Sequence, residues 1–241
     1  MDSIKEQCKK LYLGAFEDDA EFTNLLFDSC FENCCYYLTE GQTVVSMLFA
    51  FDVFIEGNKG KYIYAVATNP EYRGKGYMRK LFLDTENMLT DEYSFFCLRP
   101  MSEGLFDFYA KLDFEEKFFK SYTVLKGNKS SLESVFVKDI KDIKRIRKIL
   151  CDEIFVEYCD EFYTLLTSYC DVITDSLDNP TYLIIKEKIS RKIKEFLGDD
   201  KNLPAYVSGE APTCNGTERY AVYKSLGYIL NDKAYLGLAM D

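Results

Sequence analysis

The stretch VATNPEYRGKGYMRKLF, residues 66–82, places two glycines and two basic residues between an apolar run and a helical pattern. These four residues are Arg73, Gly74, Lys75 and Gly76. A helix that begins at such a turn leaves backbone N–H groups unpaired beside the positive end of its dipole. Because this arrangement binds anions, the stretch predicts a phosphate site. A turn that merely leads into a helix is the structural alternative.

Spacing separates the known phosphate-binding patterns from one another. The dinucleotide fingerprint Gly-x-Gly-x-x-Gly would need glycine at Arg79, and the P-loop needs Gly-Lys-Ser/Thr, which the sequence does not contain. What remains is Arg-x-x-Gly, from Arg73 to Gly76, after the strand-like run YAVAT.

The surrounding pattern predicts a mixed α/β order. Apolar residues at helical spacing and runs of β-branched and aromatic residues alternate along the first half of the chain. We expect helices within 3–16 and 18–34, three strands within 35–68, a helix after Gly76, a strand at 93–100, a helix at 103–112 and a strand at 121–126.

This order and the motif resemble the GNAT superfamily of acetyl-CoA-dependent N-acetyltransferases. The family motif is Gln/Arg-x-x-Gly-x-Gly/Ala, so Arg73 and Gly76 match, while Met78 stands where glycine or alanine is preferred. LFDFYAKLDF, residues 105–114, resembles the family's Ala-x-x-Phe-Tyr-x-x-Leu-Gly-Phe stretch, with Asp113 in place of its glycine. The resemblance implies an α/β fold with a mixed sheet; it is strong in the first half of the chain and faint in the second.

The resemblance also implies acetyl-CoA as cosubstrate and indicates the residues that contact it. In the family the loop amides hold the pyrophosphate, and the preceding strand pairs with the pantetheine arm. The implied contacts are Val66, Ala67 and Thr68 on the strand, followed by Arg73, Gly74, Lys75, Gly76, Tyr77 and Met78. Tyr109 matches the tyrosine that commonly serves as general acid for the departing thiolate; a core-facing aromatic residue is the alternative.

Acetyl transfer to an amine also needs a base, because a lysine-like amine has a pKa of about 10.4. The chain has no histidine, and the strand KYIYAVAT carries no carboxylate where some family members place one. Glu103 and the C-terminal carboxylate of Asp241 are the candidates that sequence offers.

Three functions follow from these residues. The leading hypothesis is an acyltransferase that moves an acetyl group from acetyl-CoA to a primary amine of a small molecule or peptide. The alternative is a catalytically weak acyl-CoA-binding or regulatory module, suggested by Met78 and Asp113. The third is a metal or redox sensor built on Cys30, Cys34 and Cys35, although buried thiols on a packed helix are the preferred reading and we expect no metal site.

Composition limits the partners. A formal charge of -10 argues against nucleic-acid binding and favours a cationic acceptor. No apolar run reaches the roughly 18 residues of a membrane helix, and residues 1–10 do not form a signal-peptide pattern. We therefore expect a cytoplasmic protein that does not engage a membrane. The sequence leaves open whether the protein forms a homodimer.

Turn residues at 127–131, GNKSS, predict a domain boundary. We expect an acetyl-CoA-binding domain at residues 1–127 and a smaller, diverged GNAT-like repeat at residues 128–241. The repeat is suggested by VYKSLGY at 222–228, which can be laid on FYAKLDF and makes Tyr223 the counterpart of Tyr109. Within the second half we predict helices at 155–173 and 189–197.

Overall fold

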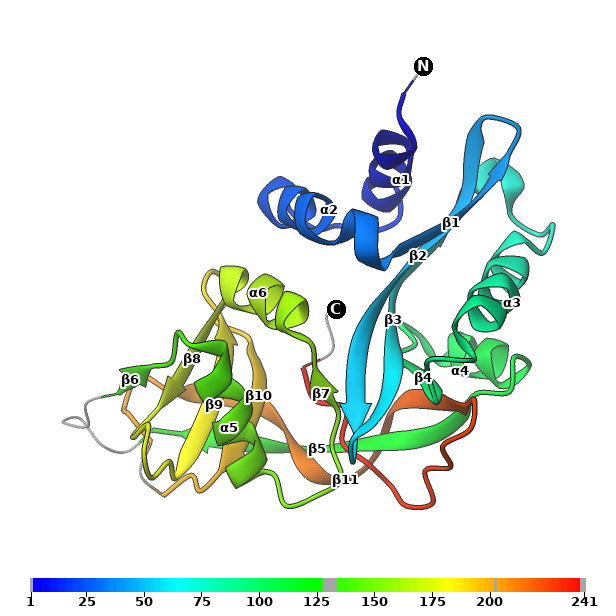
Figure 1. The fold of residues 1–241 in the computed structure, drawn as a ribbon. Coiled ribbons are helices and arrows are strands. Elements are labelled where there is room, and N and C mark those ends of the chain that lie inside the picture. The colour runs from blue at the N-terminus through cyan, green and yellow to red at the C-terminus, as the bar shows by residue number, and fades with distance from the viewer. Residues whose placement is uncertain (1, 128–133, 202, 239–241) are drawn as a thin grey trace. The chain divides into compact units, whose positions relative to one another are not determined.

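The computed structural model describes residues 2–127, 134–201 and 203–238 (Figure 1). The chain forms two compact units: Met1–Glu115 with Val222–Ile229, and Glu116–Ala221 with Leu230–Asp241. This division differs from the expected split after residue 127, because a late segment of the chain returns to the first unit. Most of the predicted GNKSS turn lies outside the described residues. The two-domain split stays a prediction.

The first unit begins with two helices and continues as a meander of three strands, as the sequence predicts. Ser3 and Asp19 cap the helices, because each side chain accepts a hydrogen bond from an amide in the first turn. The elements are α1 (Ile4–Leu13), α2 (Ala20–Cys34), β1 (Cys35–Glu40), β2 (Thr43–Ile55), β3 (Asn58–Thr68), α3 (Tyr77–Leu89), β4 (Phe95–Leu98) and α4 (Glu103–Ala110).

The sheet of the first unit is mixed. β2 pairs antiparallel with β1 and with β3, and β3 pairs parallel with β4. Val222–Ser225, the end of β11 (Ser208–Ser225), pairs antiparallel with β4. Figure 1 shows α1 and α2 on one face of β1–β3, and α3 and α4 on the other. A helix joins the parallel strands β3 and β4, as such a crossover requires.

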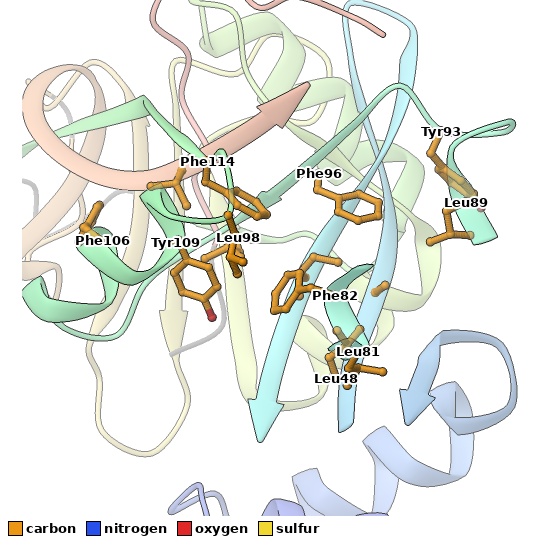
Figure 2. Close-up of a cluster of buried hydrophobic side chains, with 14 residues drawn as sticks. Leu48, Leu81, Phe82, Leu89, Tyr93, Phe96, Leu98, Phe106, Tyr109 and Phe114 are labelled. Atoms are coloured by element: carbon orange, nitrogen blue, oxygen red, sulfur yellow. The ribbon is translucent and has the colours of Figure 1, made fainter. Parts of the chain in front are cut away.

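The core cluster between the sheet and α3–α4 holds α4 in place (Figure 2). Phe82 of α3 meets the rings of Tyr109 and Phe114 edge-on, with centroids 5.8 and 6.0 Å apart. Aromatic pairs in this geometry add to the stabilisation that burial alone gives. The orientation of α4, and with it the position of Tyr109, therefore depends on this aromatic cluster.

Asp113 occupies the left-handed turn that follows α4. Its φ is 65°, in the region that favours glycine, and aspartate is among the residues that tolerate it. The amide of Phe114 then donates to the carbonyl of Tyr109. Asp113 thus holds a backbone conformation that glycine adopts without strain.

The second unit starts with β5 (Glu115–Lys126) and contains a second set of two helices and three strands. A four-stranded sheet has the order β10-β9-β8-β6, with antiparallel pairs throughout. Its further elements are β6 (Val135–Phe136), α5 (Ile140–Leu150), β7 (Glu157–Tyr158), α6 (Asp160–Tyr169), β8 (Cys170–Thr174), β9 (Tyr182–Glu187) and β10 (Ile193–Gly198), before residues 208–221 of β11. Apart from the short β7, the order α5-α6-β8-β9-β10 parallels α1-α2-β1-β2-β3. The diverged repeat stays a prediction.

Three expectations for the second half are wrong. The helix predicted at 189–197 is the strand β10, whose residues 193–197 are all buried, so its charged residues do not mark an exposed helix face. The helix predicted at 155–173 contains α6 but ends at Tyr169, where the β-branched residues of β8 begin. Tyr223 lies on β11, paired with Cys97, whereas Tyr109 lies on a helix, so the two are not counterparts.

A buried ion pair lies at the centre of the second unit. Arg147 donates from Nε and Nη2 to both carboxylate oxygens of Glu195, at 2.8 and 3.0 Å. Arg147 also donates to the hydroxyl of Tyr163 at 2.8 Å. The side chains of Arg147 and Glu195 are 1% and 0% exposed, so neither charge can be solvated if its partner is lost.

Replacing Glu195 by alanine should lower the free energy of unfolding by about 3–5 kcal/mol, because it leaves the Arg147 guanidinium buried without its counter-charge. Glu116→Ala is the matched control, since Glu116 pairs with Arg219 at the surface with both side chains about 40% exposed. The control should cost no more than about 1 kcal/mol. Urea unfolding measures the free energy of unfolding of both variants. Equal losses would contradict the assignment of Arg147 and Glu195 as a buried, stabilising ion pair.

Replacing Asp113 by glycine should raise the free energy of unfolding by about 0.5–1 kcal/mol, because glycine adopts the positive φ without strain. The same change at Asp107, an exposed residue inside α4, should lower it by about 0.3 kcal/mol, since glycine weakens a helix interior. Opposite signs in thermal or urea unfolding are the expected result. Destabilisation by both variants would show that the side chain of Asp113 is needed.

Candidate functional site

The turn between β3 and α3 has the backbone conformation of an anion site. Gly74 and Gly76 have φ values of 75° and 81°, which strongly favour glycine. The first helical hydrogen bond of α3 runs from the amide of Lys80 to the carbonyl of Gly76. Within the part of the chain that the structure describes, the amides of residues 74–79 donate to no protein acceptor. They form a row of donors at the positive end of the helix dipole.

Open space lies beside this row of amides. A Cβ atom built on Gly74 or Gly76 would meet no atom within 4 Å. Met78, which replaces the family's small residue, is half-buried and packs against the core cluster. Its bulk is therefore accommodated by the protein core, and the departure at this position does not fill the space beside the glycines.

The loop carries exposed positive charge. Arg73 is exposed and donates from Nε to the carbonyl of Thr68 at 3.1 Å, which ties the loop to the end of β3. Lys75 is exposed as well, with Nζ 4.7 Å from the ring centroid of Tyr72. Arg73 also lines a cavity of about 300 Å³ with Asn69 and α1 residues that include Lys10. Cationic side chains here favour an anionic ligand.

The strands β3 and β4 part beside the loop. Their parallel pairing covers residues 60–63 of β3 and ends at Leu98, after which Pro100 cannot continue a ladder. Ala65 has φ of 52°, and the register with β2 shifts between Met47 and Phe49, which marks a bulge in β3. Residues 66–68 therefore extend beyond the last β3–β4 pair, with the edge that faced β4 no longer paired to it.

Tyr109 lies in the core cluster on the α3–α4 side of the sheet. It is 5% exposed, and Figure 2 shows its hydroxyl directed away from Phe114. Burial raises the pKa of this phenol well above the ordinary value. Tyr109 is therefore a neutral hydrogen-bond and proton donor at physiological pH.

The structure brings the sequence-predicted residues together in one unit. Residues 66–68 lead directly into the loop at 73–78, and Tyr109 packs on the helix that this loop begins. Sequence reasoning missed the bulge at Ala65, because no residue pattern distinguishes alanine at positive φ. It also missed a polar cluster of Asp18, Tyr12 and Tyr64 on the α1–α2 side of β3.

Among residues 2–127, 134–201 and 203–238, no group of three or more Cys, Asp or Glu side chains is arranged to hold a metal ion, and no helix is long and apolar enough to cross a membrane. Cys30 and Cys34 lie on α2 and Cys35 begins β1. Glu103 is an exposed residue at the start of α4, and Asp241 lies outside the described residues.

The chain shares its fold with solved structures of acyltransferases. A probable N-acyltransferase from Enterococcus faecalis V583 aligns with a TM-score of 0.65 at 15% identity, over 92% of this chain and 70% of its own. GCN5-related N-acetyltransferases from Kribbella flavida and Anabaena variabilis ATCC 29413 align with TM-scores of 0.62 at 11% and 12% identity. They cover 94% and 92% of this chain and 71% and 69% of their own.

Sequence comparison was made with curated proteins and with models of protein families. No curated protein matches the chain. The family model of the acetyltransferase (GNAT) domain matches residues 2–116, the stretch that contains the loop, the parted strands and Tyr109. Acetyl-CoA is the cosubstrate that fits this family, and the open row of amides fits its pyrophosphate. Residues 2–116 therefore match the GNAT acetyltransferase domain.

Proposed function

We propose that this protein is an N-acetyltransferase that moves the acetyl group of acetyl-CoA to a primary amine of a small molecule or peptide by direct attack on the thioester. The observation that carries the proposal is the combination of two features in one place. The amides of residues 74–79 are suited to a pyrophosphate, and residues 66–68, which no longer pair with β4, lie shortly before them in the chain. The first can hold the charged part of acetyl-CoA, and the second can pair with its amide-containing arm.

Each part of the site then has a role. Val66, Ala67 and Thr68 would bind the pantetheine arm through backbone groups, as an added strand does. The loop from Arg73 to Met78 would bind the pyrophosphate. The thioester supplies an activated acyl group, and backbone amides near the bulge can stabilise the negative charge that develops on its carbonyl oxygen.

Tyr109 is assigned as the general acid. A buried phenol with a raised pKa keeps its proton at neutral pH and can donate it to a departing thiolate. As an acid it is active below its pKa, so the assignment predicts no loss of turnover from Tyr109 ionisation until the pH exceeds the ordinary tyrosine value of 10.0.

A cationic acceptor is consistent with the formal charge of -10. The alternative, a catalytically weak acyl-CoA-binding module, rested on Met78 and Asp113. Met78 packs against the core, and Asp113 keeps the positive φ of a glycine, so neither residue favours the alternative in the structure. A cytoplasmic location and a homodimer stay predictions.

Calorimetry should show acetyl-CoA and CoA binding at about one site per chain. The double variant Arg73→Ala, Gly76→Asp should weaken both by about 100-fold, because it removes a cation and places a carboxylate beside the pyrophosphate. Gly57→Asp is the matched control, since Gly57 has the same φ of 81° and equally open space. Unchanged affinity in the double variant would refute the loop as the cofactor site.

Tyr109→Phe should lower kcat by about 100-fold while the affinity for CoA stays the same, because only the proton donor is lost. Tyr93→Phe removes a hydroxyl from another buried tyrosine of the core cluster and should leave kcat unchanged. Steady-state kinetics of CoA release measure both variants. Undiminished turnover in Tyr109→Phe would remove Tyr109 from the mechanism.

A further inference from the structure

A cavity of about 300 Å³ lies within the first unit, beside the cofactor loop. Three segments line it: α1 with the residues that directly follow it, the start of β2, and the turn that leads from β3 to Arg73. Arg73 is covalently joined to Gly74, the first residue of the row of unpaired amides. The cavity is therefore next to the proposed pyrophosphate site.

Strand pairing places the cavity past the end of β3. Thr43 and Val44 line it from β2, and they precede Ser46, which pairs with Thr68, the last residue of β3. The bulge at Ala65, where the thioester would react, lies in the opposite direction along the strand. In acetyl-CoA, the group on the far side of the pyrophosphate from the thioester is the 3′-phosphorylated adenosine. This end of the cosubstrate is the one that the position of the cavity favours.

Positive side chains line part of the cavity. Arg73 donates from Nε to the carbonyl of Thr68, and its terminal nitrogens are further donors. Lys10 lines the cavity from α1, with Nζ 2.5 Å from Oδ2 of Asp2. Both side chains of this pair are more than half exposed, at 67% and 51%, so the pair contributes little and a phosphate can replace Asp2. Among the described residues that line the cavity, none is aspartate or glutamate.

The remaining lining suits a purine ring. Leu11, Ala15, Val44 and Pro70 give the cavity apolar surface. Helix α1 ends at Leu13, and the last carbonyls of a helix lack partners within it and carry partial negative charge. They would repel a second anionic group but can accept hydrogen bonds from an amino group. The cavity therefore suits a ligand with one anionic end and one donating end, as phosphate and the amino group of adenine provide.

The size of the cavity agrees with a part of the cosubstrate. Small-molecule sites span about 300–1,000 Å³, so this cavity is at the lower end of the range. It can take one end of acetyl-CoA while the pantetheine arm lies along residues 66–68.

We propose that this cavity binds the 3′-phosphoadenosine end of acetyl-CoA, with Lys10 and Arg73 on the 3′-phosphate and the base against the apolar lining. The inference rests on the proposed function, since it uses the same cosubstrate and the same loop. It assigns a specificity to the site: donors that carry the 3′-phosphoadenosine are preferred over donors that end at phosphopantetheine.

Calorimetry with the full chain tests the phosphate contact, with CoA and with dephospho-CoA, which lacks only the 3′-phosphate. The wild type should bind CoA about 100-fold more tightly than dephospho-CoA, because two charge-assisted contacts are lost with the phosphate. Lys10→Gln should weaken CoA binding by about tenfold and leave dephospho-CoA binding unchanged. Lys9→Gln is the matched control, since Lys9 lies on the same helix, donates to Asn24 and does not line the cavity.

A second variant tests the position of the base. Ala15 is exposed, so Ala15→Trp fills part of the cavity without disturbing the core. We expect it to weaken CoA and dephospho-CoA by about tenfold each, while the affinity for 4′-phosphopantetheine, which lacks the adenosine, stays unchanged. Ala20→Trp, at another exposed alanine, should alter none of the three affinities.

The outcomes separate this inference from the proposed function. If CoA binds but dephospho-CoA binds equally well, and neither variant changes any affinity, the inference is overturned and the proposed function stands. If Lys10→Gln weakens CoA and dephospho-CoA by the same factor, Lys10 does not contact the 3′-phosphate and the inference is again overturned. If the wild type binds no CoA, the proposed function fails and the inference fails with it.

Discussion

The site depends on the point at which β3 stops pairing with β4. Parallel pairing that continued past Ile63 and Leu98 would consume the backbone groups of residues 66–68 and leave nothing for a ligand to pair with. Two local features end it: the left-handed Ala65 turns β3, and Pro100 prevents β4 from extending. Helix α3 then begins at Tyr77, after the turn that contains Gly74 and Gly76.

The two faces of the sheet surround their buried tyrosines differently. On one face, the core cluster buries Tyr109 among apolar rings, which disfavours the phenolate and keeps the proton on the oxygen. On the other, Tyr64 and Tyr12 are buried but connect to a carboxylate that reaches solvent. The first environment keeps the phenol of Tyr109 neutral, whereas the second links two tyrosines to a carboxylate.

Much of this could be predicted from residue patterns. The helices, strands and loop of the first unit follow from periodicity and from Gly74 and Gly76, because local preference and tertiary structure agree there. The second unit is harder to predict. Lys194 and Glu195 lie among the buried residues of β10, and the partner of Glu195, Arg147, is 48 residues away, so the local sequence does not show that this charge is buried. The pairing of Val222–Ser225 with β4 also joins segments that lie far apart in the sequence, so no local pattern predicts it.

The residues of the candidate site also differ in whether the sequence alone reveals them. The cofactor loop is contiguous in sequence and could be found from a motif. The cluster of Tyr12, Asp18 and Tyr64 could not, because its members come from a helix, a loop and a strand, and only the folded unit brings them together. Helical spacing already places Met78 on the apolar face of α3 with Leu81 and Phe82, and its packing against the core decides whether its size matters to the ligand.

The most direct measurement is a titration of isotope-labelled protein with CoA, followed by backbone amide NMR. If the loop and the parted strand hold the cofactor, the amide signals of Gly74 to Met78 and of Val66 to Thr68 should shift together, with one common affinity, while that of Gly57 stays in place. Saturable binding that shifts other amides and leaves these two segments unchanged would contradict the assignment of the site.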